Sequence, residues 1–146
     1  MGRLELVEVL GVLSRAECRC GNNKFLSKDD KKNYIIDVDG VVCQDICNCS
    51  PDLMGDALVN EDARNIINGW YDDGNTITFF TARVPDHEII TRCWLLKNGF
   101  KYHNIIFGKP RGGNYHYIDD KNVRATRFDG KFGNFIRTSK LIEVFE

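Results

Sequence analysis

The sequence lacks a long hydrophobic run and an excess of charge of either sign. No stretch approaches the roughly 18 apolar residues that indicate a membrane-spanning helix. Lys and Arg number 20 against 21 Asp and Glu, a net charge of −1, so no global positive field attracts nucleic acid. Glu5 and Glu8 interrupt the apolar N-terminal stretch, which argues against a secretory signal. We therefore expect a cytoplasmic protein with no membrane partner.

Cysteine is the one unusual component of an otherwise ordinary composition. The chain has 146 residues, of which 42% are hydrophobic and 28% charged, as expected for a globular domain that buries a core without staples. Free, reduced thiols are predicted, because such a domain without a secretory signal needs no disulfides. Zinc binding is the alternative, although the spacing lacks the usual C-x₂-C pattern. Its candidate ligands are Cys18, Cys20, Cys43, Cys47 and Cys49.

The chain is predicted to begin with a polar extension that precedes a single domain. Residues 14–32 are rich in Gly, Asn, Lys and Asp, and residues 1–32 carry no chemistry that we can assign. We therefore expect an N-terminal extension or linker over 1–32 and one domain over 33–146.

Alternating strand and helix signals within 33–146 predict an α/β fold. Strands are expected over 34–38, 76–80, 104–107 and 115–118, and helices over 60–74 and 85–98, with a further helix over 138–145. The first strand has apolar residues on both faces, as in a sheet covered by helices on both sides. This order predicts a Rossmann-like three-layer sandwich with a mainly parallel sheet.

Each predicted strand ends in residues with chemical capacity. The carboxyl ends of parallel strands meet at one edge of the sheet, so these residues should lie close together. Carboxylates can hold Mg²⁺ there, and a Lys and a Thr can hold a phosphate beside it. The strand ends carry Asp37 and Asp39 followed by Gly40, then Thr81, Lys109, and the pair Asp119-Asp120.

These strand ends, in this order, resemble the four motifs of the haloacid dehalogenase-like (HAD) superfamily. The resemblance covers residues 34–127 and is closest to the small phosphatases without a cap domain that are often met in surface-polysaccharide biosynthesis loci. It rests on Asp37-Val38-Asp39-Gly40-Val41, Phe79-Phe80-Thr81-Ala82-Arg83, Gly108-Lys109-Pro110 and Tyr117-Ile118-Asp119-Asp120. Val41 stands where the family more often has Thr.

The resemblance implies a role for each motif residue. Asp37 would be the nucleophile that forms an aspartyl-phosphate, and Asp39 would protonate the leaving group and later deprotonate water. Mg²⁺ would be bound by Asp37, the Asp39 carbonyl and one of the Asp119-Asp120 pair, with Asp119 the first choice.

Phosphate binding is assigned to the remaining motif residues. Thr81 would donate a hydrogen bond to the phosphate, Lys109 would neutralise charge, and Gly40 and Ala82 would line the phosphate site. Arg83 would be either a second phosphate contact or a surface ion-pair partner.

The expected substrate is a small phosphomonoester such as a sugar phosphate. The 42 residues from Asp39 to Thr81, and the stretch from Thr81 to Lys109, leave no room for a cap domain. The site would then be open, or closed by the 40–58 loop or by a second subunit of a homo-oligomer. Nucleic acid is the less expected partner. Local positive charge over 109–140 nevertheless keeps a polynucleotide-end (3′-phosphate) phosphatase as an alternative, and a non-catalytic phosphate-binding domain is another.

Overall fold

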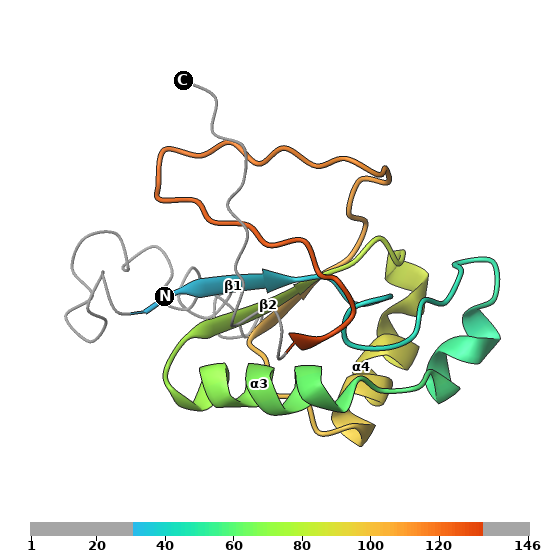
Figure 1. Cartoon of the computed structure of the whole chain (residues 1–146). Helices are drawn as coiled ribbons and strands as arrows, with labels where there is room; N and C mark the ends of the chain where they lie inside the picture. The colour runs from blue at the N-terminus through green and yellow to red at the C-terminus, as the bar shows by residue number, and fades with distance from the viewer. Residues whose placement is uncertain (1–30, 133–146) are drawn as a thin grey trace, which may run out of the picture. The chain divides into compact units, whose positions relative to one another are not determined.

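The computed structural model describes residues 31–132, and these form a parallel sheet with helical connections (Figure 1). The chain divides into Met1–Lys32 and Asn33–Glu146, and every element below belongs to the second unit. The elements in chain order are β1 (Asn33–Ile36), η2 (Pro51–Asp56), α3 (Glu61–Asp72), β2 (Thr76–Phe80), η3 (Pro85–His87), α4 (Glu88–Lys97) and β3 (Asn104–Ile106). Cys18, Cys20 and the helix predicted over 138–145 lie outside the described residues.

Helix α3 begins and ends where the sequence predicts. Asn60 is the N-cap, and Glu61 and Asp62 lie in the first turn, where carboxylates suit the helix dipole. The Asn60 side chain does not cap the helix; its amide donates to the Val41 carbonyl at 3.1 Å and so ties the helix start to the loop after β1. Gly74 follows with φ 92°, a backbone conformation that glycine adopts without strain.

The sheet has the order β1-β2-β3, and both pairs are parallel. Sequential order with right-handed crossovers places both connecting helices on the same face, and Figure 1 shows α3 and α4 on one side. Ile36 and Phe79 are paired and buried on the helix side, whereas Ile35 on the opposite face is 57% exposed. The described residues therefore form two layers, and the third layer stays a prediction.

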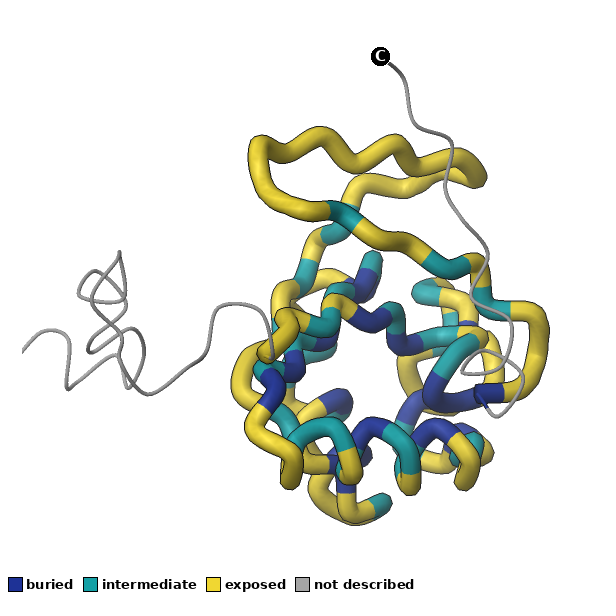
Figure 2. The backbone as a smooth tube through the Cα atoms, turned by 60° about the vertical axis from the view of Figure 1, so that its left-hand side comes forward, coloured by how far each residue is buried: buried dark blue, intermediate teal, exposed yellow. Residues whose placement is uncertain are grey.

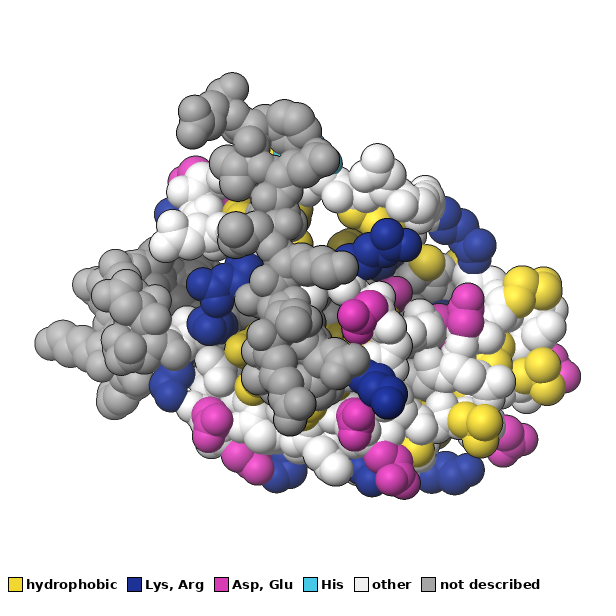
Figure 3. Space-filling view, viewed as in Figure 1, with side chains coloured by type: hydrophobic (Ala, Val, Ile, Leu, Met, Phe, Trp, Pro, Cys, Tyr) yellow, Lys and Arg dark blue, Asp and Glu magenta, His cyan; other side chains and the backbone are white. Residues whose placement is uncertain are grey.

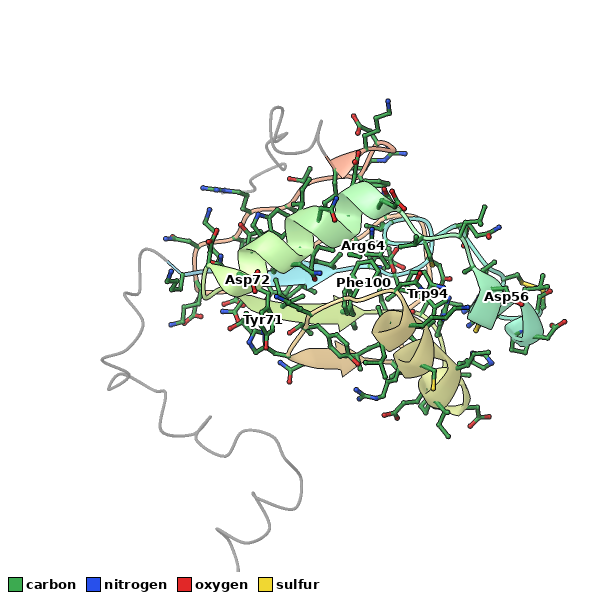
Figure 4. All side chains as sticks on the ribbon, turned by 90° about the horizontal axis from the view of Figure 1, so that it is seen from below. Asp56, Arg64, Tyr71, Asp72, Trp94 and Phe100 are labelled. Atoms are coloured by element: carbon green, nitrogen blue, oxygen red, sulfur yellow. A yellow bond between two sulfur atoms is a disulfide. The ribbon has the colours of Figure 1, made fainter. Side chains whose placement is uncertain are left out.

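Aromatic side chains fill the space between the sheet and α4. Phe79 of β2 meets Phe100 edge-on, with ring centroids 5.9 Å apart, and Phe100 stacks on Trp94 of α4 at 5.6 Å (Figure 4). The Trp94 indole N–H donates to the Ala57 carbonyl at 2.9 Å, so the ring also fixes the segment after η2. These contacts thus hold α4 and the segment after η2 against the sheet.

The fourth strand predicted over 115–118 is not formed. Residues 107–131 contain neither helix nor strand, and residues 111–120 are all exposed (Figure 2). Local bonds replace a strand ladder there: the Tyr115 hydroxyl donates to the Pro110 carbonyl at 2.7 Å, and the Tyr117 hydroxyl to Asp119 at 2.5 Å. A strand forms only when a neighbour pairs with it, and alternating apolar residues do not provide that neighbour.

Every helix within residues 31–132 is too short or too polar to span a bilayer.

Candidate functional site

A tight turn after β1 presents two carboxylates on either side of a buried valine. Val38 is fully buried, and its carbonyl accepts from the N–H groups of Val41 and Val42 at 3.1 and 3.0 Å. Gly40 has φ 82°, which closes the turn. Asp37 and Asp39 consequently remain half-buried at the carboxyl end of the strand.

Asp37 and Lys109 form an ion pair across the end of the sheet. The Lys109 Nζ lies 3.6 Å from Asp37 Oδ1, and the exposed fractions of the two side chains are 16% and 39%. Burial raises the pKa of the Asp37 carboxyl, and Asp39 adds to the rise, whereas Lys109 and the Val38 N–H partly oppose it. Asp37 is thus a carboxylate with incomplete solvation beside one cation, which makes it a candidate functional group.

The backbone beyond β2 and β3 places Lys109. The ladder continues past the strand ends: the Thr81 N–H donates to the Ile106 carbonyl, and the Lys109 N–H donates to the Thr81 carbonyl, both at 2.9 Å. The Lys109 Nζ then lies over two rings, 4.7 Å from the centroid of Tyr115 and 5.8 Å from that of Phe80. The predicted meeting of the ends of three strands is therefore realised for Asp37, Thr81 and Lys109.

Asp39 is held by Arg83, which is buried and does not reach the surface. The Arg83 Nε donates to Asp39 Oδ2 at 2.9 Å and Nη2 donates to Oδ1 at 2.7 Å, a bidentate pair. Arg83 is 1% exposed, and its Nη1 donates to the Thr91 hydroxyl at 2.9 Å. The guanidinium is therefore directed at Asp39 and α4. Of the two roles predicted for Arg83, the structure shows the ion-pair partner, but the pair is buried and not at the surface.

Thr81 and Ala82 come directly before Arg83 in the turn after β2. The Thr81 hydroxyl accepts from the Arg83 N–H at 3.1 Å, which leaves its own proton to donate, although the side chain is fully buried. The Ala82 carbonyl accepts from the Asn48 amide at 3.1 Å. Asn48 lies in the 40–58 loop, so this bond fixes the loop against the turn that carries Thr81 and Arg83.

The prediction of free thiols is wrong for two cysteines of this loop. Cys47 and Cys49, which flank Asn48, form a disulfide; the short spacing that counts against a zinc knuckle still lets two sulfurs meet. Cys43 and Cys93 are free, the first buried and the second exposed. The Cys43 sulfur lies 4.0 Å from Arg83 Nη2, and burial raises the pKa of the thiol to about 12.

Cys43 is therefore expected to resist alkylation in the folded protein. Only the thiolate reacts, and a pKa of about 12 keeps Cys43 protonated at pH 8, whereas Cys93 is exposed. Iodoacetamide at pH 8 followed by peptide mapping should modify Cys93 and leave Cys43 unmodified until urea is added. Modification of Cys43 at the rate of Cys93 without denaturant would contradict this.

The acidic pair Asp119-Asp120 is not brought to the other two acids. Both residues are exposed, and the Tyr117 hydroxyl and the Lys121 N–H both donate to Asp119, which lowers the pKa of that carboxyl. Residues 31–132 contain no group of three potential His, Cys, Asp or Glu ligands. Asp119 and Asp120 are therefore not placed to complete a magnesium site with Asp37 and the Asp39 carbonyl in this arrangement. The cause is the missing fourth strand.

A groove of about 390 Å³ begins at Asp37 and Lys109 and follows β1. Five of the aromatic rings that line it belong to Tyr34, Trp70, Phe80, Tyr115 and Phe128, and Arg127 is also on its wall. Tyr34 and Trp70 stack at 3.9 Å, so part of this wall is rigid. The charged pair thus opens onto an aromatic surface.

Two residues of the site have no motif signal. Thr91 and Asn48 contact the site from α4 and from the loop, 8 and 34 residues from their respective partners Arg83 and Ala82. Thr91 lies in an apolar helix, where a buried hydroxyl suggests a polar partner but does not name it.

Fold and site together define an α/β protein with a charged site at the carboxyl edge of a parallel sheet. No family model and no curated protein matches the chain. One similar solved structure is a target protein from Vibrio cholerae, 29% identical, with TM-score 0.49, covering 64% of this chain and 83% of that one. Another belongs to a Pnkp1/Rnl/Hen1 complex, 18% identical, with TM-score 0.49, covering 64% of this chain and 32% of that one. Both TM-scores lie below 0.5, so neither likeness assigns a family or an activity.

Proposed function

We propose that this chain is a HAD-type phosphomonoester hydrolase in which Asp37 is the nucleophile. The observation that carries the proposal is the Asp37–Lys109 pair at the sheet edge, with 3.6 Å between Nζ and Oδ1. A carboxylate with a raised pKa retains electron density for attack, and the ammonium offsets the charge of an approaching phosphate. The Thr81 hydroxyl accepts from the Arg83 N–H and so keeps its own proton to donate to a phosphoryl oxygen.

The reaction takes two displacements. An Asp37 oxygen attacks phosphorus, the bond to the leaving oxygen breaks, and that oxygen takes a proton from Asp39. Water then attacks the aspartyl-phosphate and gives a proton to Asp39, so that inorganic phosphate leaves and both carboxyl groups are restored. Asp39 oxygens have further lone pairs beside those that accept from Arg83, so the proton has a place to reside.

Mg²⁺ is part of the proposal through the resemblance alone. Asp119 or Asp120 would have to lie beside Asp37, which the arrangement described does not provide. Absence of a cap domain is likewise proposed. It is supported by the connections Asp39–Thr81 and Thr81–Lys109, which are occupied by elements of the sheet and its helices. An open site of this kind suits a small phosphorylated metabolite such as a sugar phosphate.

The aromatic groove favours the second candidate, a phosphatase for polynucleotide 3′ ends. Rings beside a charged phosphate site can stack on bases, and Arg127 could meet a backbone phosphate. Against it, the face seen in Figure 3 has its Lys and Arg side chains, among the described residues, spread among acidic ones and not gathered in a stripe.

Phosphate release from matched substrates tests the proposal. Sugar phosphates, nucleotides and a 3′-phosphorylated oligonucleotide are each incubated with the full chain, with Mg²⁺ or with EDTA. We expect release from a sugar phosphate, reduced by EDTA. Preference for the oligonucleotide would select the second candidate, and no release from any substrate under either condition would refute the enzyme.

A further inference from the structure

Arg83 is a cation in the core of the domain, and all of its side-chain nitrogens have a partner. Among residues 31–132 it is the largest of the fully buried side chains. Removing a guanidinium from water costs several kcal/mol unless charge and hydrogen bonds compensate. Here Nε and Nη2 bind the two oxygens of Asp39, and Nη1 binds the Thr91 hydroxyl. Because each of these nitrogens has a partner, the position and the plane of the guanidinium are fixed.

The backbone of Arg83 is fixed as firmly as its side chain. Its N–H donates to the Thr81 hydroxyl at 3.1 Å, and its carbonyl accepts from the Gly108 N–H at 2.8 Å. Thr91 is fully buried on α4, so the tip of the side chain is bound to a helix packed in the core. Arg83 therefore joins the turn after β2, helix α4 and the turn after β1 at one point.

We propose that Arg83 and Thr91 are positioning residues that hold the Asp39 carboxylate in the orientation from which it exchanges a proton with the leaving oxygen. This rests on the function proposed above. Asp39 lies in the turn after β1, and both oxygens of its carboxylate accept from the Arg83 guanidinium. The planar fork of the guanidinium fixes the plane of the carboxylate, and Thr91 fixes the plane of the guanidinium.

Burial separates this role from substrate binding. Arg83 is 1% exposed, whereas Lys109 has 16% of its side chain exposed and adjoins the groove. Lys109 is then the cation that meets the phosphate, and the positive charge of Arg83 acts on Asp39. Proton transfer needs heavy atoms within hydrogen-bond reach. Rotation of the Asp39 carboxylate would therefore lower the rate of proton transfer without weakening substrate binding.

The choice of leaving group tests this proposal. An alkyl phosphate releases a basic alkoxide that needs a proton from Asp39, whereas 4-nitrophenyl phosphate releases a stable phenolate that does not. Thr91→Val keeps the shape of the side chain and removes the hydroxyl. It should lower kcat for the alkyl ester about tenfold, leave its KM unchanged, and change kcat for the nitrophenyl ester less than about twofold. Thr91→Ser should restore the alkyl rate.

Two further variants complete the design. Arg83→Lys keeps the charge without the fork and should show the same selective loss. Arg92→Ala breaks an exposed pair with Glu88 on the same helix and should alter neither rate. Melting curves establish that each variant is folded.

The outcomes separate the two proposals. Equal losses with both esters would mean a structural role, unchanged rates would mean no role, and a raised KM would mean substrate binding; each overturns the positioning role alone. A wild-type chain that hydrolyses neither ester would overturn the proposed function itself, and the positioning role with it.

Discussion

Replacing Asp39 with alanine is expected to lower the free energy of unfolding by about 3–5 kcal/mol, the range for breaking a buried ion pair by removing one partner. The cost comes from Arg83, which is 1% exposed and would lose the acceptor for two of its nitrogens. Total stabilities of small domains are about 5–15 kcal/mol, so this is a large share. Urea unfolding followed by tryptophan fluorescence measures it, because Trp94 is buried.

Asp72→Ala is the matched control. It also breaks an acid–base pair, between Asp72 and Lys101 at 2.8 Å, but their side chains are 58% and 50% exposed. Exposed pairs contribute at most about 1 kcal/mol, so the control should scarcely move the midpoint. If Asp39→Ala cost no more than Asp72→Ala, water would be solvating the guanidinium, and the buried pair would not hold the turn.

Asp37→Asn is expected to abolish hydrolysis and at the same time to stabilise the fold at neutral pH. Without the nucleophile the rate should fall at least about a thousandfold. Stability should rise because burial raises the pKa of Asp37 above its usual value, which means that the folded state disfavours the ionised carboxyl. An uncharged amide of the same shape removes that penalty.

The pH dependence gives the sign of this second effect. A raised pKa in the folded state makes the ionised form a cost above that pKa, and the cost disappears as the pH falls through it. The gain in Tm of Asp37→Asn over wild type should therefore be largest near pH 7 and shrink toward acidic pH. Asp129→Asn, an equal change of charge at an exposed position, should give no such trend. A lower Tm for Asp37→Asn at pH 7 would contradict the prediction.

The two acids thus respond oppositely although they are two residues apart. Asp37 is half-buried with one cation at 3.6 Å, whereas Asp39 accepts two hydrogen bonds from a buried guanidinium at 2.9 and 2.7 Å. The Asp37 carboxylate has little compensation for its charge, whereas the Asp39 carboxylate is well compensated and fixed in position. The proposed chemistry needs this contrast. Asp37 must donate an electron pair as the nucleophile, and Asp39 must stay in a fixed position to carry the proton.

Local patterns in the sequence determined the elements and the meeting of three strand ends. Asn60 stands at the N-cap position of α3 and Gly74 follows its end, where the positive φ is a local requirement that glycine meets. The alternation in Thr76–Phe80 identifies a strand, and parallel order then brings Asp37, Thr81 and Lys109 to one edge. These inferences need only short-range periodicity and the chirality of crossovers, which sequence carries directly.

Contacts between distant segments decided the rest. The partner of Arg83 is 44 residues away, and nothing near Arg83 in the chain specifies whether it meets phosphate, solvent or Asp39. Tyr115–Ile118 have the alternation of a strand, but strand formation depends on pairing with a neighbour, and so the position of Asp119-Asp120 depends on it too. Sequence thus placed Asp37, Thr81 and Lys109 at strand ends. Only tertiary packing determined which charge each one meets, because burial and pairing energies arise between segments that local patterns do not connect.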